Sequence, residues 1–344
     1  MKIWNGYQKG VNLGGWFSQC DHSKDRYDNF IKEDDFAVIK SWGADHVRLP
    51  IDYELLEKEG GSPDESGYDR LKKVIRLCRK NGLNLIFDLH KTAGFSFDKG
   101  EGESGFFESE KYQERFYRLW ENIARHFTAD ADIVAFELLN EVTEKEYKDV
   151  WNRISGTCIR RIRAIAPSVY ILVGGYYHNS VTAVKDLALP FDDKIIYNFH
   201  CYEPHIFTHQ GAYWIDGMDL SFRLPVTSTF GQMREADRSL DCCLFSDEIY
   251  GDLPSSDTLS PAFFESLMAE AVRVAEERNV PLYCGEYGVI DRATPEDTVV
   301  WYRMIHEALT HYGIGRAAWS YREMDFGLAD KRLDAVREEL IRYL

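Results

Sequence analysis

Short runs rich in Val, Ile, Leu and Phe alternate along the chain with longer segments in which apolar residues recur every three or four positions. The runs are typical of buried parallel strands and the longer segments of amphipathic helices. Eight runs predict strands at Gly10–Leu13, His46–Pro50, Asn84–His90, Ile133–Asn140, Val169–Gly175, Ile195–Tyr202, Pro281–Gly288 and Gly315–Tyr321. Eight repeats of strand then helix predict an α/β fold, the (β/α)8 TIM barrel.

The spacing of the predicted strands indicates one domain, residues 1–344, with one insertion. The gap after the sixth strand is about twice the others, and the surplus lies in residues 203–260. Loops that follow barrel strands lie over the carboxyl-terminal mouth, so we expect this insertion to form a wall or lid there. The alternative, a second domain, would be small to fold alone.

Composition narrows the possible partners. The chain has 57 acidic and 41 basic residues and a net charge of −16, without a basic cluster, which disfavours nucleic acid. No apolar stretch is long enough to cross a bilayer, so no membrane partner is expected. We expect a monomer. The first six residues include no apolar leader segment, which predicts a cytoplasmic protein unless a leader has been removed.

Two glutamates follow predicted strands at the same end of the barrel. Glu141 follows the fourth strand and Glu286 lies in the seventh, so their side chains are expected to face one another across the mouth. Two carboxylates flanking a substrate bond are the minimum equipment for glycoside hydrolysis. A gap of ~5–5.5 Å between them would indicate retention of configuration, and ~6.5–9.5 Å inversion.

Other strand ends carry side chains that suit a sugar. Asn140 offers an amide for a sugar hydroxyl, and Arg48 and Tyr202 can donate hydrogen bonds to a carboxylate and keep it ionised. Trp319, and Trp214 in the insertion, offer flat apolar faces for a pyranose ring. The expected substrate-binding residues are Arg48, His90, Asn140, His200, Tyr202, Trp214 and Trp319.

The sequence gives weaker support to two other chemistries, metal binding and Schiff-base formation. His200, His205 and His209 suggest a metal site, but their spacing fits no regular helix face, and no metal is expected. Lys91 follows a strand end, where a lysine can form a Schiff base, but as the residue after His90 it is expected to point away from the mouth.

Six motifs stand in a characteristic order along the chain: Gly10-Val11-Asn12-Leu13-Gly14-Gly15-Trp16, Arg48-Leu49-Pro50, Leu139-Asn140-Glu141, His200-Cys201-Tyr202, Gly285-Glu286-Tyr287-Gly288 and Trp319. Together they resemble glycoside hydrolase family 5, in the clan of retaining (β/α)8 glycosidases. Within that family, the opening motif, the end of the sixth strand and the long insertion are most similar to compact endoglucanase C-type enzymes.

The resemblance implies a covalent glycosyl-enzyme, with Glu286 as nucleophile and Glu141 as acid/base, and no cofactor. We expect Glu141, near a neutral His200, to start protonated. The implied substrate is a β-glucan polysaccharide or oligosaccharide, β-1,4-linked or mixed-linkage. The opening motif is also similar to that of exo-β-1,3-glucanases, and the family includes β-mannanases, so both stay open. A carbohydrate-binding protein without turnover is the alternative of a different class, although such a protein usually lacks one of the two carboxylates.

Overall fold

The computed structural model describes residues 1–344, apart from the side chains of residues 99, 247 and 248. Its strands are β1 (Lys9–Asn12), β2 (His46–Asp52), β3 (Asn84–Thr92), β4 (Phe95–Ser96), β5 (Val134–Glu137), β6 (Tyr170–Gly174), β7 (Ile195–His200), β8 (Leu282–Tyr287) and β9 (Gly315–Ala318). All except β4 pair in parallel, and β2 pairs with both β1 and β3, so the sheet closes on itself. The fold is therefore the predicted (β/α)8 TIM barrel.

The eight predicted strands are all present, with shifted ends. The fourth ends at Glu137 instead of Asn140, because the chain then leaves the ladder and Glu141 has a left-handed backbone with φ of 44°. The eighth ends at Ala318 instead of Tyr321. The short strand β4, which pairs antiparallel with the end of β3, was not predicted.

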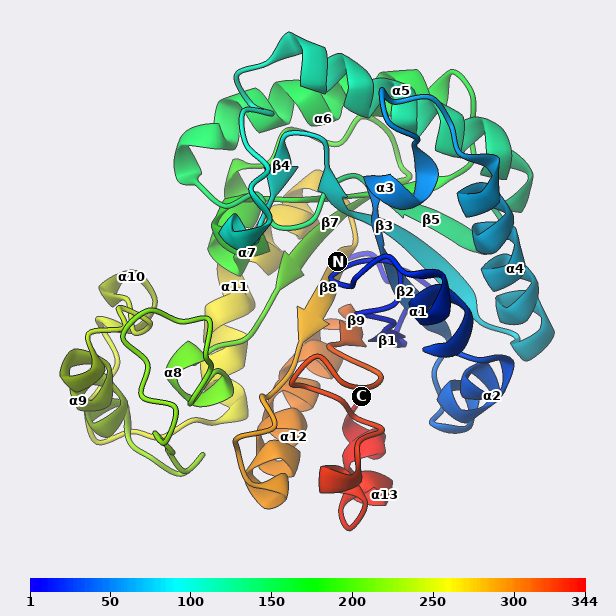
Figure 1. The fold of residues 1–344 in the computed structure, drawn as a ribbon. Helices are drawn as coiled ribbons and strands as arrows, with labels where there is room; N and C mark the ends of the chain where they lie inside the picture. Colours follow the sequence, from blue (N-terminus) through cyan, green and yellow to red (C-terminus); the bar gives the residue numbers. More distant parts are fainter.

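The helices surround the ring of strands (Figure 1). They are α1 (Lys24–Asn29), α2 (Glu33–Ser41), α3 (Tyr53–Leu56), α4 (Glu65–Asn81), α5 (Glu110–Phe127), α6 (Lys148–Arg163), α7 (Tyr176–Asn179), α8 (His205–Thr208), α9 (Phe230–Leu240), α10 (Asp247–Tyr250), α11 (Pro261–Arg278), α12 (Pro295–Tyr312) and α13 (Arg337–Leu340). Six of them, α1, α4, α5, α9, α11 and α12, begin after a residue whose side chain caps the first turn. For example, α12 begins after the side-chain cap of Thr294 and ends at the left-handed Gly313.

Side chains alternate between the two faces of each strand. Along β3, Leu85 and Phe87 pack outward in the main core with the helices, whereas Ile86 belongs to a separate cluster inside the barrel. Tyr283 and Ala317 belong to that interior cluster too, and Trp4 packs against it. The interior near the amino ends of the strands is therefore mainly apolar, with one buried polar contact between His46 Nε2 and the Tyr283 hydroxyl at 2.6 Å, and most polar interior residues lie toward the carboxyl ends.

Residues 203–260 contain α8, α9 and α10, which Figure 1 shows together at one side of the barrel beside α11. The first part of this segment reaches the strand ends, because Ala212 packs in one apolar cluster with Ile290, Trp319 and Phe326. Across the described residues, none of the helices has the length and apolarity that a bilayer crossing requires.

Candidate active site

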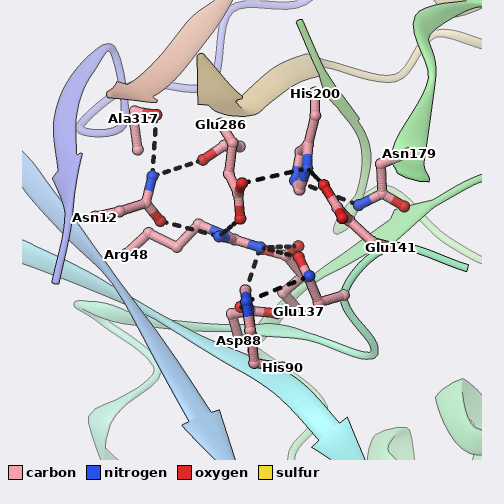
Figure 2. A network of polar contacts seen from close by, with 12 residues as sticks. Asn12, Arg48, Asp88, His90, Glu137, Glu141, Asn179, His200, Glu286 and Ala317 are labelled. Atoms are coloured by element: carbon pink, nitrogen blue, oxygen red, sulfur yellow. Dashed lines mark hydrogen bonds and ion pairs between the residues drawn. The ribbon is translucent and has the colours of Figure 1, made fainter. Parts of the chain in front are cut away.

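Glu141 and Glu286 meet at the carboxyl ends of the strands (Figure 2). An oxygen of Glu141, an oxygen of Glu286 and a ring nitrogen of His200 all lie within 4.8 Å of one another. The two carboxylates are mostly buried, but 11% of the Glu141 side chain and 6% of the Glu286 side chain remain exposed. The structure therefore brings both glutamates to one point that solvent reaches.

Arg48 on β2 lies beneath this point and is fully buried. Its Nε and Nη2 donate to the two oxygens of Glu137 at 2.7 and 2.8 Å, and its Nη1 donates to Glu286 Oε1 at 2.7 Å. Nη2 also lies 3.0 Å from Asp88 Oδ2. Burial alone would lower the pKa of Arg48, but these three carboxylates outweigh burial and raise it well above its ordinary value. Arg48 is therefore a permanent cation in the barrel interior.

Each carboxylate oxygen of Glu286 accepts one hydrogen bond. Arg48 Nη1 donates to Oε1, and the Tyr202 hydroxyl donates to Oε2 at 2.8 Å. Burial and the neighbouring Glu286 raise the pKa of Tyr202 well above its usual value, so its hydroxyl keeps the proton that it donates. This arrangement fits an anionic nucleophile held in one orientation.

Gly285 precedes Glu286 and lies against two side chains of the site. A Cβ on Gly285 would come within 2.7 Å of Asn198 Oδ1 and 3.1 Å of His200 Nε2. The Gly285 N–H also donates to Asn198 Oδ1 at 2.9 Å. Asn198 and His200 pack so closely against position 285 that only glycine, which has no Cβ, fits there.

We expect Gly285→Ala to lower both activity and stability, the latter by about 1–3 kcal/mol, because the new methyl group must push Asn198 or His200 aside. The matched control is Gly156→Ala inside α6, where the nearest atom to a Cβ is the Arg160 guanidinium at 3.7 Å. Because alanine favours helix, the control is expected to stabilise by roughly 0.5–1 kcal/mol. Urea unfolding and kcat/KM measure both effects. Wild-type values for Gly285→Ala would contradict this account of the packing.

Both oxygens of Glu141 contact an imidazole. His200 Nδ1 lies 2.7 Å from Oε1, and His178 Nδ1 lies 3.0 Å from Oε2. Burial raises the pKa of Glu141, but the hydrogen bonds from His178 and His200 outweigh it and hold the pKa well below its usual range. This direction runs against the expectation that Glu141 starts protonated, which took account of His200 alone, whereas the carboxylate has two imidazole neighbours.

His90, Asn140 and Trp319 complete the predicted set around the glutamates. His90 Nε2 lies 3.4 Å from Asn140 Nδ2, and Asn140 Oδ1 accepts from Arg48 Nη2 at 2.9 Å. The Trp319 ring stacks parallel to His90 at a centroid distance of 5.7 Å and is mostly buried. Most of the Trp319 surface is thus already covered by protein.

Trp214 lies outside the hydrogen-bonded centre. The residue is 44% exposed, and its ring lies 6.1 Å from that of His209, which in turn lies 5.1 Å from the Tyr202 ring, between centroids. The structure thus connects Trp214 to the site through one intervening ring, with its own surface open to solvent.

Several residues of the site were missed by the sequence reasoning. Inside the barrel, Asn12 Oδ1 accepts from Arg48 Nη1 at 2.9 Å, and Asn198 Nδ2 donates to Glu137 Oε1 at 2.7 Å. Strand alternation could have found some of them, because Asn198 stands two residues before His200 on the same face of β7. The missed residues are Asn12, Asp88, Glu137, His178, Asn179 and Asn198.

The described side chains contain two groups of three that could hold a metal ion: Glu141, His200 and Glu286, and His22, Asp52 and Glu54. The first group is the centre described above. In the second, Lys91 Nζ lies 2.6 Å from Glu54 Oε1. Contacts with Asp52, whose Oδ2 lies 3.4 Å from His22 Nε2, and with Cys20 raise the pKa of His22 to about 10, which makes it a second side-chain cation there. Two cations therefore already balance these carboxylates.

Lys91 itself is unsuited to Schiff-base chemistry. Burial would lower its pKa, but Glu54, Asp52 and Glu101 outweigh burial and raise it. The amine therefore stays protonated and is no nucleophile.

The three histidines considered for a metal site do not share one helix face, because His200 lies on β7 and only the other two belong to α8 and its C-cap. His205 begins α8 and His209 is its C-cap, so the two stand one helical turn apart, and their rings stack at 5.2 Å. Burial and the neighbouring His205 lower the pKa of His209 well below its ordinary value, so His209 is a neutral ring.

The model of the cellulase family, glycosyl hydrolase family 5, matches residues 5–325. The chain is 50% identical to cellodextrinase A of Ruminococcus flavefaciens over 90% of this chain and 84% of that protein. It is 33% identical to endoglucanase C of Acetivibrio thermocellus over 98% of both chains.

Solved structures share the fold. An endoglucanase from the hyperthermophilic Thermotoga maritima superposes with a TM-score of 0.77 at 21% identity, covering 98% of this chain and 97% of the other. A hyperthermophilic endo-β-1,4-glucanase superposes with a TM-score of 0.75 at 24% identity over the same shares of the two chains. Family match, relatives and barrel agree: the chain is a glycoside hydrolase and belongs to the cellulase family, glycosyl hydrolase family 5.

Proposed function

We propose that this enzyme hydrolyses internal β-1,4-glucosidic bonds of glucans and their oligosaccharides with retention of configuration. Glu286 attacks the anomeric carbon, and Glu141 acts first as acid and then as base. The observation that carries the mechanism is the short separation of the two carboxylates: one oxygen of Glu141 and one of Glu286 lie within 4.8 Å of each other. A water molecule between them, as inversion requires, needs a gap of ~6.5–9.5 Å.

The two steps follow from these contacts. In the first, the anomeric carbon forms a bond with a Glu286 oxygen while the bond to the leaving oxygen breaks, and Glu141 gives that oxygen its proton. In the second, water attacks the same carbon, Glu141 takes the water proton, and the ester bond to Glu286 breaks. Arg48 and Tyr202 receive the carboxylate of Glu286 again at the end, in the orientation that the structure shows.

The names of the relatives support the substrate. Cellodextrinase A, at 50% identity, is named for cellodextrins, and endoglucanase C, at 33% identity, for cleavage within glucans. We further propose that residues 203–260 border the bound chain at the mouth, with Trp214 as a stacking surface, because Ala212 packs in one cluster with Trp319. We propose that one chain is the active unit, since the barrel of a single chain supplies both glutamates and the side chains that hydrogen-bond to them.

The test of retention is the configuration of the first product. In a nuclear magnetic resonance time course on cellotetraose, the β-anomer is expected before mutarotation produces the α-anomer. Products from carboxymethyl-cellulose, barley glucan, laminarin and glucomannan establish the linkage and the sugar. First release of the α-anomer would refute the mechanism, and cleavage of laminarin or glucomannan alone would refute the β-1,4-glucan assignment in favour of β-1,3-glucan or mannan.

A further inference from the structure

The contact between His178 and Glu141 has no part in the two steps above. His178 Nδ1 lies 3.0 Å from Glu141 Oε2, on the side opposite His200, whose Nδ1 lies 2.7 Å from Oε1. The two imidazoles differ in their surroundings: the His200 side chain is 2% exposed, whereas that of His178 is 54% exposed. His178 therefore contacts both the carboxyl group of Glu141 and the solvent.

His200 contacts the other oxygen of Glu141. An ionised carboxylate only accepts hydrogen bonds, so His200 donates from Nδ1 to Glu141 Oε1. On its other side, His200 Nε2 lies 3.4 Å from Asn179 Nδ2 (Figure 2). Because His200 occupies Oε1, the oxygen left for the proton that Glu141 delivers is Oε2, which faces His178.

The backbone holds His178 in this place. Tyr177, His178 and Asn179 have φ values of 50°, 55° and 56°, a left-handed conformation that non-glycine residues keep only where their surroundings impose it. Here the N–H groups of Tyr177 and His178 donate to the carbonyl oxygens of Thr143 and Val142. These two residues directly follow Glu141. The loop after β6 is thus fastened to the segment that carries the acid/base.

We propose that His178 is a positioning residue for Glu141 and that the two side chains share the proton which Glu141 delivers to the leaving oxygen. This inference rests on the proposed function. In one arrangement the imidazole N–H donates to the Glu141 carboxylate, and in the other the Glu141 carboxyl O–H donates to the imidazole. The proton crosses one hydrogen bond, and the pair neither gains nor loses a proton.

The sharing has a consequence for pH dependence. An ordinary imidazole keeps its proton to a pH about two units higher than an ordinary glutamic acid. The pair therefore retains one proton to a higher pH than Glu141 would alone, and activity, which needs that proton, extends to higher pH. The other titratable groups that face the pair are His200, Tyr202, His209 and Glu286.

The test compares His178→Asn and His178→Ala with the wild type across pH. The Asn amide stands at the same number of bonds from Cα as imidazole Nδ1, tolerates a left-handed backbone and does not titrate. In both variants the alkaline limb of kcat/KM on cellotetraose is expected to fall about 1–2 pH units lower. At pH values below that limb, we expect His178→Asn to keep kcat/KM within about threefold of wild type. We expect His178→Ala to lose about tenfold in kcat/KM, which is part of the ~10²–10⁴-fold rate contribution of general acid catalysis.

A second substrate separates a role through Glu141 from a general loss of structure. On 2,4-dinitrophenyl cellobioside, whose leaving group needs no acid, kcat/KM of both variants below the limb is expected to match wild type. His311→Ala, on the exposed end of α12, is the control for loss of a histidine and should keep the wild-type profile.

An alkaline limb that stays in place or moves to higher pH, or equal losses on the two substrates, would overturn the inference, and so would a shifted limb in the His311 control. The proposed function fails separately, since it requires the wild-type enzyme to hydrolyse cellotetraose with retention whatever the His178 variants do.

Discussion

Glu286→Gln is expected to lower kcat on every β-glucoside by on the order of 10⁴-fold or more. The amide has nearly the shape of the carboxylate but cannot form a glycosyl ester. His200 is another side chain near position 286. Its Nδ1 lies 3.7 Å from Glu286 Oε2 and is already hydrogen-bonded to Glu141. Arg48 still pairs with Glu137 and Asp88, so the variant is expected to fold. Initial rates on cellotetraose and on 2,4-dinitrophenyl cellobioside measure the loss.

A trapping experiment makes the assignment specific. A 2-deoxy-2-fluoro cellobioside with a good leaving group should label wild-type enzyme at Glu286, as read from the mass of the peptide, and should leave Glu286→Gln unlabelled. Glu307→Gln, on the exposed face of α12, is the control and should behave as wild type. A variant at Glu286 that retained more than about a tenth of wild-type kcat, or a label on another residue, would show that Glu286 is not the nucleophile.

Glu141→Ala is expected to discriminate between leaving groups. On cellotetraose, whose leaving sugar needs a proton, kcat/KM should fall by about 10²–10⁴-fold. On 2,4-dinitrophenyl cellobioside the first step needs no acid, so the glycosyl-enzyme should form rapidly and then accumulate, because no base activates water. A burst of released dinitrophenol followed by slow turnover measures this.

Added azide provides the second readout for this variant. Azide is a nucleophile that needs no base, and alanine leaves room for it beside His200 and His178, so azide should raise the slow rate and yield a β-glycosyl azide. Equal loss in the Glu141 and Glu286 variants on the activated substrate, with no response to azide in either, would mean that the two roles are wrongly assigned.

Strand periodicity was sufficient to predict the barrel, because parallel strands covered by helices on one side and packed inside on the other are continuous runs of apolar residues. It also located both glutamates, since polar residues at the carboxyl ends of barrel strands converge. Strand alternation explains why Asp88 and Asn198 could have been added: each stands two residues before a predicted site histidine, His90 and His200.

Other parts of the site lie beyond pattern reasoning. The run Tyr176-Tyr177-His178-Asn179 has no glycine to mark a left-handed turn, and its conformation depends on backbone hydrogen bonds to Val142 and Thr143, more than thirty residues earlier. His178 was therefore not foreseen, nor was its effect in lowering the pKa of Glu141. Glu137 was visible as a strand end, but its bidentate contact with Arg48 depends on how three strands close around the barrel axis.

The buried Arg48 divides the enzyme into a part that tolerates change and a part that does not. Its partners Asn12, Asp88, Glu137 and Glu286 lie on β1, β3, β5 and β8, and the fifth, Asn140, lies in the segment that follows β5. Four of the five partners therefore belong to the strands of the barrel. Lengthening or exchanging the rim loops leaves this arginine undisturbed, and substrate preference can diversify there. A substitution of Arg48 or of its partners would alter the reaction and the folding together. The bond-breaking step is therefore expected to stay the same while the preferred glycan changes.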